Sequence, residues 1–269
     1  WGGDEVPKLC RCRTEGADTD NARADYARTN TSTNHTSIFP GMPINNTATA
    51  TGHLWGENQQ GDPYATYGVT VHDPHTGAPF NTAGHAPEKT SYSYVNSVFD
   101  VAHDAGLRTG HYYGKMRLDL HRASWDSKID SSLYKAGPAY GTGTDGTPDL
   151  VSAWLADMNA DPFHYSFFHF SRTDHTGHNA TWNVTPGSNY MAVVKEVDGY
   201  LGQMFNLIET DPRFAGKTAI VITTDHAGNL GGTGHGTVTD IDNYRIPFYV
   251  WGPGVQAGAD LYTLNPQYT

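Results

Sequence analysis

Acidic and histidine side chains follow two predicted strands of this chain at short spacings. Asp174 and His178 stand four residues apart just after one apolar run, and Asp225 and His226 come directly after the buried-strand pattern TAIVITT. His235 follows in the segment GNLGGTGHG, whose glycines allow the loop to fold back sharply. Carboxylate oxygens and imidazole nitrogens are ligands that Zn²⁺ takes in catalytic sites. Together these side chains predict a metal site.

A single Asp-His step after a strand usually belongs to a polar loop, and we interpret His175 as a bystander of this kind. The combined pattern is more informative, because few roles other than metal binding need such a cluster. Two metal ions about 4 Å apart stabilise the attacking and leaving oxygens of an in-line displacement at phosphorus. The pattern therefore points to phosphoryl transfer, which also needs a nucleophile.

Residues 28–37 read RTNTSTNHTS and precede a short apolar helix at Ile38 and Phe39. A hydroxyl at a helix N-terminus lies where backbone N–H groups and the helix dipole favour an anion. Metal coordination would lower its pKa and make the alkoxide available. On composition alone, however, a run of Thr and Asn is more often a loop or a helix cap.

The elements around these residues predict an α/β fold with a doubly wound, mostly parallel central sheet and helices on both faces. In such a fold ligands bind beyond the carboxyl ends of the strands, where the acid–histidine pairs stand. Residues 30–62 predict a loop, a short helix and another loop, and 61–90 a long irregular segment. Apolar spacing predicts helices over 94–105 and 190–208, and proline near the first turn predicts helices over 7–15 and 148–158. Short apolar runs predict strands over 108–113, 163–170, 218–223 and 246–251.

The composition excludes several classes of protein. The 269 residues suffice for one large α/β domain. The net charge of -11 argues against binding to a nucleic-acid backbone. No apolar run reaches the ~18 residues of a membrane span. Cys10 and Cys12 are too close in sequence for a mutual disulfide, and we interpret them as helix residues, one facing the core. N-x-S/T triplets at Asn30, Asn34, Asn45, Asn179 and Asn183 are weak evidence for glycosylation.

The order of these motifs resembles a known family. The pieces TNTSTNHTSIF, DxxGH, TDHAG and GHG, followed by RIPFYVWGPGV, are similar to the type I phosphodiesterase / nucleotide pyrophosphatase branch of the alkaline phosphatase superfamily. SVFDVAHDAG, with the strand after it and Gly114-Lys115, also resembles that group, and bacterial secreted members most of all. The resemblance runs from about Pro7 to the C-terminus. It implies a secreted or periplasmic phosphoester hydrolase with two divalent metal ions, Zn²⁺ by expectation, and a small phosphoester substrate.

The resemblance also implies roles for single residues. It assigns Asp174, His178 and His235 to one zinc ion, and Asp225 and His226 to the other. Its nucleophile is a Thr three residues before Asn-His, which is Thr31 here; this residue bridges the metals and takes the phosphoryl group. Asn58 is the best match for an Asn that steadies a phosphate oxygen. A Thr nucleophile of this type implies a preference for phosphodiesters over monoesters.

The chain departs from the family pattern at both ends. Family members begin their sheet with a strand ending in a metal-binding Asp, whereas only residues 1–5 precede the predicted helix here. A strand needs about five residues to cross a sheet, so Asp4 is a poor candidate for that ligand. We therefore expect one catalytic domain over 1–269 that lacks its first strand and its closing C-terminal helix. The second metal site should lack one carboxylate and bind metal weakly.

There are three alternatives to this family. A sulfatase needs a C-x-P-x-R or similar motif, which the segments at Cys10 and Cys12 do not provide. A cofactor-independent phosphoglycerate mutase would use a Ser nucleophile and a larger second domain. A secreted structural or binding glycoprotein that retains this fold with an impaired metal site is the non-enzymatic alternative. Nucleotides, phospholipid head groups, sugar phosphates and teichoic-type polymers all stay open as substrates, and so does the oligomeric state.

Overall fold

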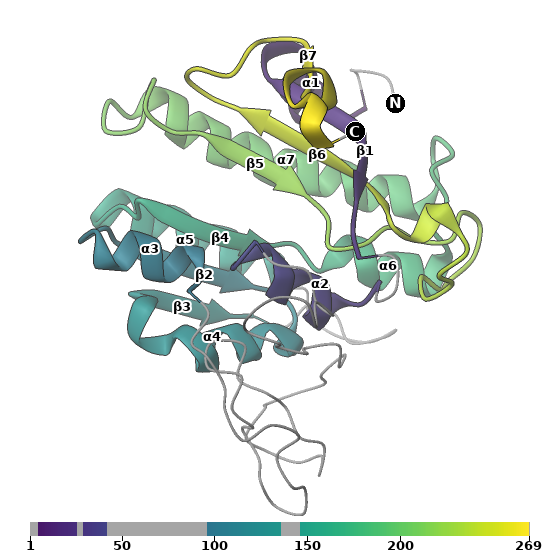
Figure 1. Cartoon of the computed structure of the whole chain (residues 1–269), viewed down its shortest axis with the longest axis horizontal. Helices are drawn as coiled ribbons and strands as arrows, with labels where there is room; N and C mark the ends of the chain where they lie inside the picture. Colours follow the sequence, from purple (N-terminus) through teal and green to yellow (C-terminus); the bar gives the residue numbers. More distant parts are fainter. Residues whose placement is uncertain (1–4, 26–28, 42–95, 136–145, 269) are drawn as a thin grey trace, which may run out of the picture. The chain divides into compact units, whose positions relative to one another are not determined.

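The computed structural model describes residues 5–25, 29–41, 96–135 and 146–268. The chain divides into two compact units (Figure 1). Unit 1 comprises Trp1–Tyr26 and Thr176–Thr269, and unit 2 comprises Ala27–His175. Each unit has a sheet of its own within the described residues.

Unit 2 is built on parallel strands in the order β3-β2-β4 (Figure 1). The central strand β2 is buried along its whole length, and its register pairs Tyr113 with Tyr134 on one side and with His169 on the other. Because parallel strands end at the same edge of a sheet, the residues that follow β2 and β4 lie side by side. The strands are β2 (Thr109–Tyr113), β3 (Ser131–Tyr134) and β4 (Tyr165–His169).

Helices cover both faces of this sheet. On one face Phe39, Phe99 and Trp125 form an aromatic core against Tyr165 and Phe167 of β4. Burying each of these large side chains contributes about 1.5–3 kcal/mol. The helices on this face are α3 (Val98–Asp104) and α4 (Asp119–Trp125).

The other face packs against α5 (Thr147–Ala160). The Trp154 indole N–H of this helix donates a 3.1 Å hydrogen bond to Ser166 of β4, and the Tyr112 hydroxyl of β2 donates to Asp157. Helices on both faces of a parallel sheet agree with the doubly wound α/β arrangement that the sequence predicts for this part of the chain.

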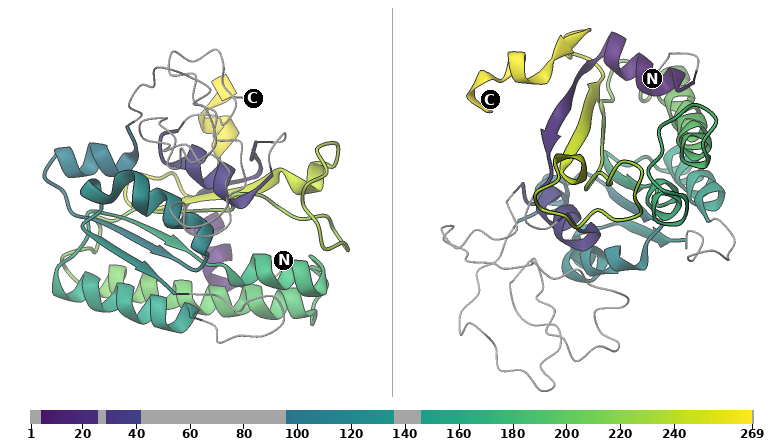
Figure 2. Two further views of the ribbon diagram at one scale, coloured as in Figure 1. Left: turned by 90° about the horizontal axis from the view of Figure 1, so that it is seen from below. Right: turned by 90° about the vertical axis from the view of Figure 1, so that its right-hand side faces the viewer.

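Unit 1 contains a second sheet, with strand order β5-β6-β1-β7. β6 pairs antiparallel with both β5 and β1, and β1 pairs parallel with β7. Figure 2 shows β1 running beside β6. The strands are β1 (Ala17–Arg23), β5 (Ile220–Thr223), β6 (Arg245–Trp251) and β7 (Ala259–Asp260).

Two helices of unit 1 pack against each other, α1 (Pro7–Glu15) and α7 (Asn189–Thr210) (Figure 2). The buried Asp198 of α7 accepts hydrogen bonds from the backbone N–H groups of Lys8 and Leu9, at 2.9–3.1 Å. A carboxylate placed there satisfies first-turn N–H groups that have no partner within their own helix. Asp198 therefore fixes α1 on α7.

Cys10 and Cys12 are free residues of α1, as the sequence predicts. Cys12 is fully buried, and this burial raises the pKa of its thiol to about 12. The thiol therefore stays protonated at neutral pH, and Cys12 acts as a small core residue.

In the described residues no helix is long and apolar enough to span a membrane.

The remaining elements are short. The helices not yet placed are α2 (Thr31–Ile38), α6 (Arg172–Ala180) and α8 (Leu261–Leu264), and the 3-10 turns are Met116–Leu118, Asp126–Lys128, Ile241–Asn243 and Pro266–Tyr268.

One part of the structure departs from the predicted parallel arrangement. The order strand, helix, strand over 163–223 implied a parallel sheet with crossover helices, whereas β4 and β5 belong to different sheets of the described structure. β5 also pairs antiparallel with β6, because the chain returns from β5 through the irregular segment 224–244 and not through a crossover helix. Parallel pairing holds instead between β2 and its two neighbours.

Histidines lie among the aromatic side chains of unit 2. His111 and His121 are fully buried; the His111 ring stacks on Phe167, and the His121 Nε2 lies 3.0 Å from the Thr36 hydroxyl. Desolvation, aided by the nearby His35, lowers the pKa of His111 to about 3, and desolvation lowers the pKa of His121 well below its usual value. Both imidazoles are therefore neutral in the folded protein at neutral pH.

These histidines predict a loss of stability in acid. Below the usual His pKa of about 6.5 these imidazoles are protonated in the unfolded chain but stay neutral in the folded chain, and His111 stays neutral until the pH falls to about 3. The free energy of unfolding should fall by about 1.4 kcal/mol per pH unit for each such histidine. Urea unfolding between about pH 7 and pH 4.5 would measure this slope. His111→Phe should flatten it; a slope in this variant as steep as that of the wild-type protein would contradict the prediction.

Candidate functional site

Asp174 and His178 lie on α6, a helix for which the sequence analysis predicted no element. Residues four apart on a helix share a face, so the helix presents both side chains in the same direction. Asp174 stands in the first turn of α6 and is largely buried, with a side chain 13% exposed. The chain passes from unit 2 into unit 1 within this helix, so Asp174 keeps its place beside His178 through the helix itself.

The segment after β5 carries Asp225, His226 and, after a turn, His235. Asn229 closes the turn, because its N–H donates to the Gly234 carbonyl at 3.0 Å. The turn brings the His235 ring onto the His226 ring, with centroids 3.8 Å apart and planes 11° from parallel. The glycine-rich segment therefore folds back as the sequence predicts.

The imidazoles of His178 and His235 face each other, with 3.2 Å between their Nε2 atoms. Two nitrogens that each lie about 2.0–2.1 Å from one tetrahedral Zn²⁺ would be roughly 3.3 Å apart. The His178 Nδ1 lies 2.8 Å from the Thr233 carbonyl, and only a protonated Nδ1 can donate to that oxygen. This bond leaves the Nε2 lone pair directed at His235, as a metal ligand requires.

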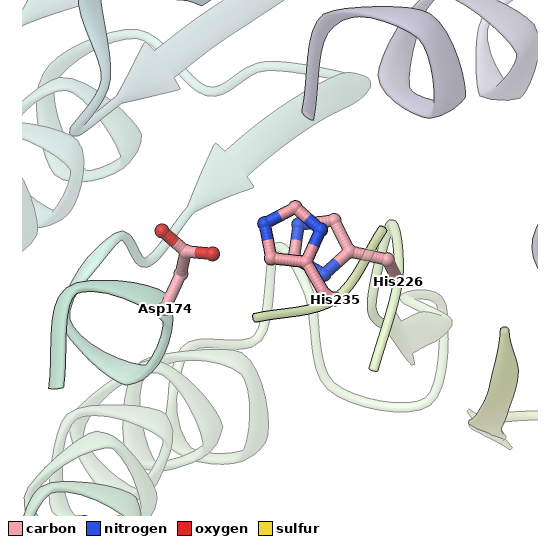
Figure 3. A group of neighbouring side chains, drawn as sticks. All are labelled: Asp174, His226 and His235. Atoms are coloured by element: carbon pink, nitrogen blue, oxygen red, sulfur yellow. The ribbon is translucent and has the colours of Figure 1, made fainter. Parts of the chain in front are cut away.

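Asp174 of unit 2 and His226 and His235 of unit 1 each offer one ligand atom for a metal ion, a carboxylate oxygen or an imidazole nitrogen (Figure 3). In Figure 3 the carboxylate belongs to α6, and the two imidazole rings of unit 1 lie one behind the other. Asp225 lies beside this group, with its Oδ2 3.3 Å from the His226 Nε2. One carboxylate and two imidazoles match the donor sets of catalytic zinc sites.

Thr31 is the first residue of α2 and is 3% exposed. Its Oγ1 lies 3.1 Å from the Nζ of Lys115. The hydroxyls of Thr33, Thr36 and Ser37 instead donate to carbonyl groups three or four residues earlier in the chain. The contact with a cation therefore distinguishes Thr31 from these three hydroxyls of its helix.

Lys115 stands two residues after the end of β2 and joins Thr31 to Asp174. Its Nζ also lies 2.5 Å from the Asp174 Oδ2, and the two side chains are 12% and 13% exposed. The pairing of β2 with β4 explains this contact, because it places the residues after both strands at one edge of the sheet. Gly114 is required there, since a Cβ on it would lie 2.5 Å from the Ser171 hydroxyl.

The structure thus brings together most of the residues that the sequence singled out. Within unit 1 His178 faces His235, the His226 ring stacks on the His235 ring, and Asp225 adjoins His226. Within unit 2 Thr31 is joined to Asp174 through Lys115, whose role the sequence pattern did not predict. The signal that could have found it is a lysine two residues after a buried strand. The predicted phosphate-binding Asn58, and Asp4 at the N-terminus, lie outside the described residues.

Comparison with known proteins agrees with these motifs. The sequence profile of the type I phosphodiesterase / nucleotide pyrophosphatase family matches residues 2–229. The search of curated proteins found no match. Solved structures with similar folds have low sequence identity to the chain.

Murine ectonucleotide pyrophosphatase / phosphodiesterase 5 is 18% identical over 82% of this chain and 52% of its own, with a TM-score of 0.52. A second structure of that protein is an inactive Thr-to-Ala variant in complex with AMP. An alkaline phosphatase superfamily protein from Vibrio parahaemolyticus is 14% identical over 96% of this chain and 57% of its own, with a TM-score of 0.55. The lipoteichoic acid synthase LtaP from Listeria monocytogenes is 13% identical over 96% of this chain and 62% of its own, with a TM-score of 0.56. The chain thus spans between 52% and 62% of the length of these proteins.

The donor geometry predicts binding of a divalent ion that depends on His235. Replacing His235 by Ala should raise the Kd for Zn²⁺ by about 100-fold or more, because the substitution removes a proposed metal ligand and not a residue that only orients one. Isothermal titration with Zn²⁺ would measure the change. His175→Ala is the matched control, since His175 follows Asp174 on the same helix and points elsewhere. We expect one tight site and a much weaker second one; equal losses in the two variants would contradict the assignment.

Proposed function

Because this chain belongs to the type I phosphodiesterase / nucleotide pyrophosphatase family, whose members are phosphoric ester hydrolases, we propose that it hydrolyses phosphoric esters with Thr31 as the nucleophile. The observation that carries the proposal is the position of Lys115. Its ammonium contacts Thr31 Oγ1 at 3.1 Å and the Asp174 carboxylate at 2.5 Å. A hydroxyl, a fixed positive charge and a metal-binding carboxylate are the groups that phosphoryl transfer requires.

We propose that Asp174, His178 and His235 hold one divalent ion, Zn²⁺ by their chemistry, and that Asp225 and His226 contribute to a second. Support comes from the donor types, the 3.2 Å between the Nε2 atoms of His178 and His235, the place of Asp174 and His178 on one face of α6, and the contact of Asp225 with His226. When bound, such ions act as Lewis acids that polarise a phosphoryl oxygen and favour the alkoxide form of a coordinated hydroxyl.

The proposed reaction has two transfers. Thr31 gives up its proton, and its Oγ1 forms a bond to phosphorus while the bond from phosphorus to the leaving alcohol breaks and that alcohol takes a proton. Water then cleaves the bond between phosphorus and Thr31 Oγ1 and restores the hydroxyl. The Lys115 ammonium is placed to stabilise negative charge on the transferred group throughout. The inactive Thr-to-Ala variant of the murine structural neighbour supports a Thr nucleophile by analogy.

The substrate class is a small phosphoester. The murine neighbour is named as a nucleotide pyrophosphatase / phosphodiesterase and was solved with AMP, which supports a phosphodiester or pyrophosphate by analogy. Asn58 as a ligand of a phosphate oxygen, one catalytic domain over 1–269, and secretion or a periplasmic location stay predictions that rest on the resemblance. The non-enzymatic alternative, a binding glycoprotein with an impaired site, is an outcome of the tests below.

Removing the Thr31 hydroxyl should abolish turnover. Thr31→Ala should lower kcat for bis-p-nitrophenyl phosphate by several orders of magnitude without unfolding the protein, as loss of a covalent nucleophile does. Thr33→Ala, which removes a hydroxyl bound to the Asn30 carbonyl, is the matched control and should retain most of the activity. A fully active Thr31→Ala variant would exclude Thr31, and an inactive wild-type protein that binds metal would favour the non-enzymatic alternative.

The family assignment predicts a preference for diesters. The ratio of kcat/KM for bis-p-nitrophenyl phosphate to that for p-nitrophenyl phosphate should exceed one in the wild-type protein. Lys115→Ala should lower both values, and the doubly charged monoester should lose more, because the ammonium then stabilises less negative charge. Lys115→Arg should restore part of the activity. A monoester value far above the diester value would reverse the proposed substrate class.

A further inference from the structure

Trp182 lies in the interior of unit 1, between the two segments that carry the candidate ligands. The residue is 6% exposed. Its backbone N–H donates to the Gly232 carbonyl at 3.2 Å, and it forms a parallel bridge with Leu230. The backbone after α6 is thus tied to the glycine-rich segment that leads to His235.

The indole ring occupies space that only glycine leaves open. A Cβ on Gly177 would lie 2.1 Å from the indole Cε2, and a Cβ on Gly228 would lie 2.1 Å from the Cδ2. Both distances are far shorter than any contact between nonbonded carbons. The ring is therefore held against two backbones, one directly before His178 and the other two residues after His226.

The same ring contacts two of the candidate metal ligands. Its centroid lies 5.0 Å from that of His178 and 5.9 Å from that of His235, and both pairs are edge-to-face. Edge-to-face packing is a preferred geometry of aromatic rings and restricts their orientation. One side chain thus sets both the separation of the two ligand segments and the orientation of two ligand rings.

The backbone before Trp182 is strained. Thr181, directly after the end of α6, has φ +65°. A β-branched residue rarely adopts this left-handed region, and the surrounding contacts must offset its strain. This residue stands between the end of α6 and Trp182, whose ring packs against Gly177.

We propose that Trp182 is a positioning residue that holds His178 and His235 at the separation one divalent ion requires, and so determines metal affinity. This inference rests on the proposed function, since it assumes that these histidines bind the ion. The physical reason is preorganisation: ligands already held at their bound separation lose less conformational freedom when the ion binds. Trp182 itself contributes no ligand atom.

The test measures Zn²⁺ affinity in full-length variants by isothermal titration. Trp182→Ala should raise the Kd by about 10- to 100-fold, and Trp182→Phe by less, because a smaller ring keeps part of the contact. Trp251→Ala is the matched control; it removes a tryptophan of unit 1 that packs on Phe205 of α7, and it should leave the Kd within about threefold.

Gly228→Ala provides an independent arm. With the indole present the new methyl group must displace it, so the Kd should rise; in the Trp182→Ala background the same substitution should have little effect. Such non-additivity is the result expected of two residues that share one contact. A merely structural role would lower the melting temperature in each variant without this pattern in the Kd.

Tryptophan fluorescence gives the third measurement. Zn²⁺ binding should change the emission of the wild-type protein, and Trp182→Phe should abolish the change because this indole adjoins both imidazoles. If the wild-type protein binds no Zn²⁺, the proposed metal site is wrong. If it binds Zn²⁺ and Trp182→Phe and Gly228→Ala keep its affinity, the metal site stands and the positioning role is wrong.

Discussion

The ion pair between Lys115 and Asp174 is the interaction on which the candidate site depends. Both side chains are nearly buried, and removing one partner from such a pair leaves an uncompensated charge, which is strongly destabilising. Lys115 also reaches Thr31, and Asp174 shares one face of helix α6 with His178. The pair therefore connects the proposed nucleophile with the proposed metal ligands, and its buried position reduces the screening of both charges.

This ion pair exists because of the fold around it. The parallel register of β2 and β4 places the ends of both strands at one edge of the sheet, where Gly114 passes close to Ser171. From that edge α6 carries Asp174 and His178 on one helical face. The turn closed by Asn229 then brings His235 back toward His178, and Trp182 fills the space between the two segments. Each step uses local backbone geometry, so the ligands need no long flexible side chains to meet.

Apolar periodicity predicted much of the architecture. The helix at 190–208 and the strands at 163–170 and 246–251 are present, as their apolar residues predicted. The helices at 7–15 and 148–158 are also present, and proline in the first turn was their signal. β1 was missed, since ADTDNAR has few apolar residues and owes its strand to pairing with β6 and β7. α6 was not predicted, because DHTGH contains poor helix formers.

Some residues of the candidate site could be predicted from the sequence and others could not. The types and spacing of Asp174, His178, Asp225, His226 and His235 were sufficient to select them, because few other roles need that pattern. Lys115 and Trp182 could not be assigned in this way. Their roles depend on which strand ends are neighbours and on which glycines face the same ring, and neither is visible in a linear sequence.

The central claim is that Thr31 accepts the phosphoryl group, and rapid-quench peptide mapping tests it most directly. The Zn²⁺-loaded protein would be mixed with bis-p-nitrophenyl phosphate, quenched in acid before the first turnover is complete, and digested for mass spectrometry. We expect a p-nitrophenyl phosphate group on the Thr31 side chain, and this group should disappear as turnover proceeds. The same adduct on Ser32 or Thr33, or steady turnover with no adduct on the protein, would contradict it.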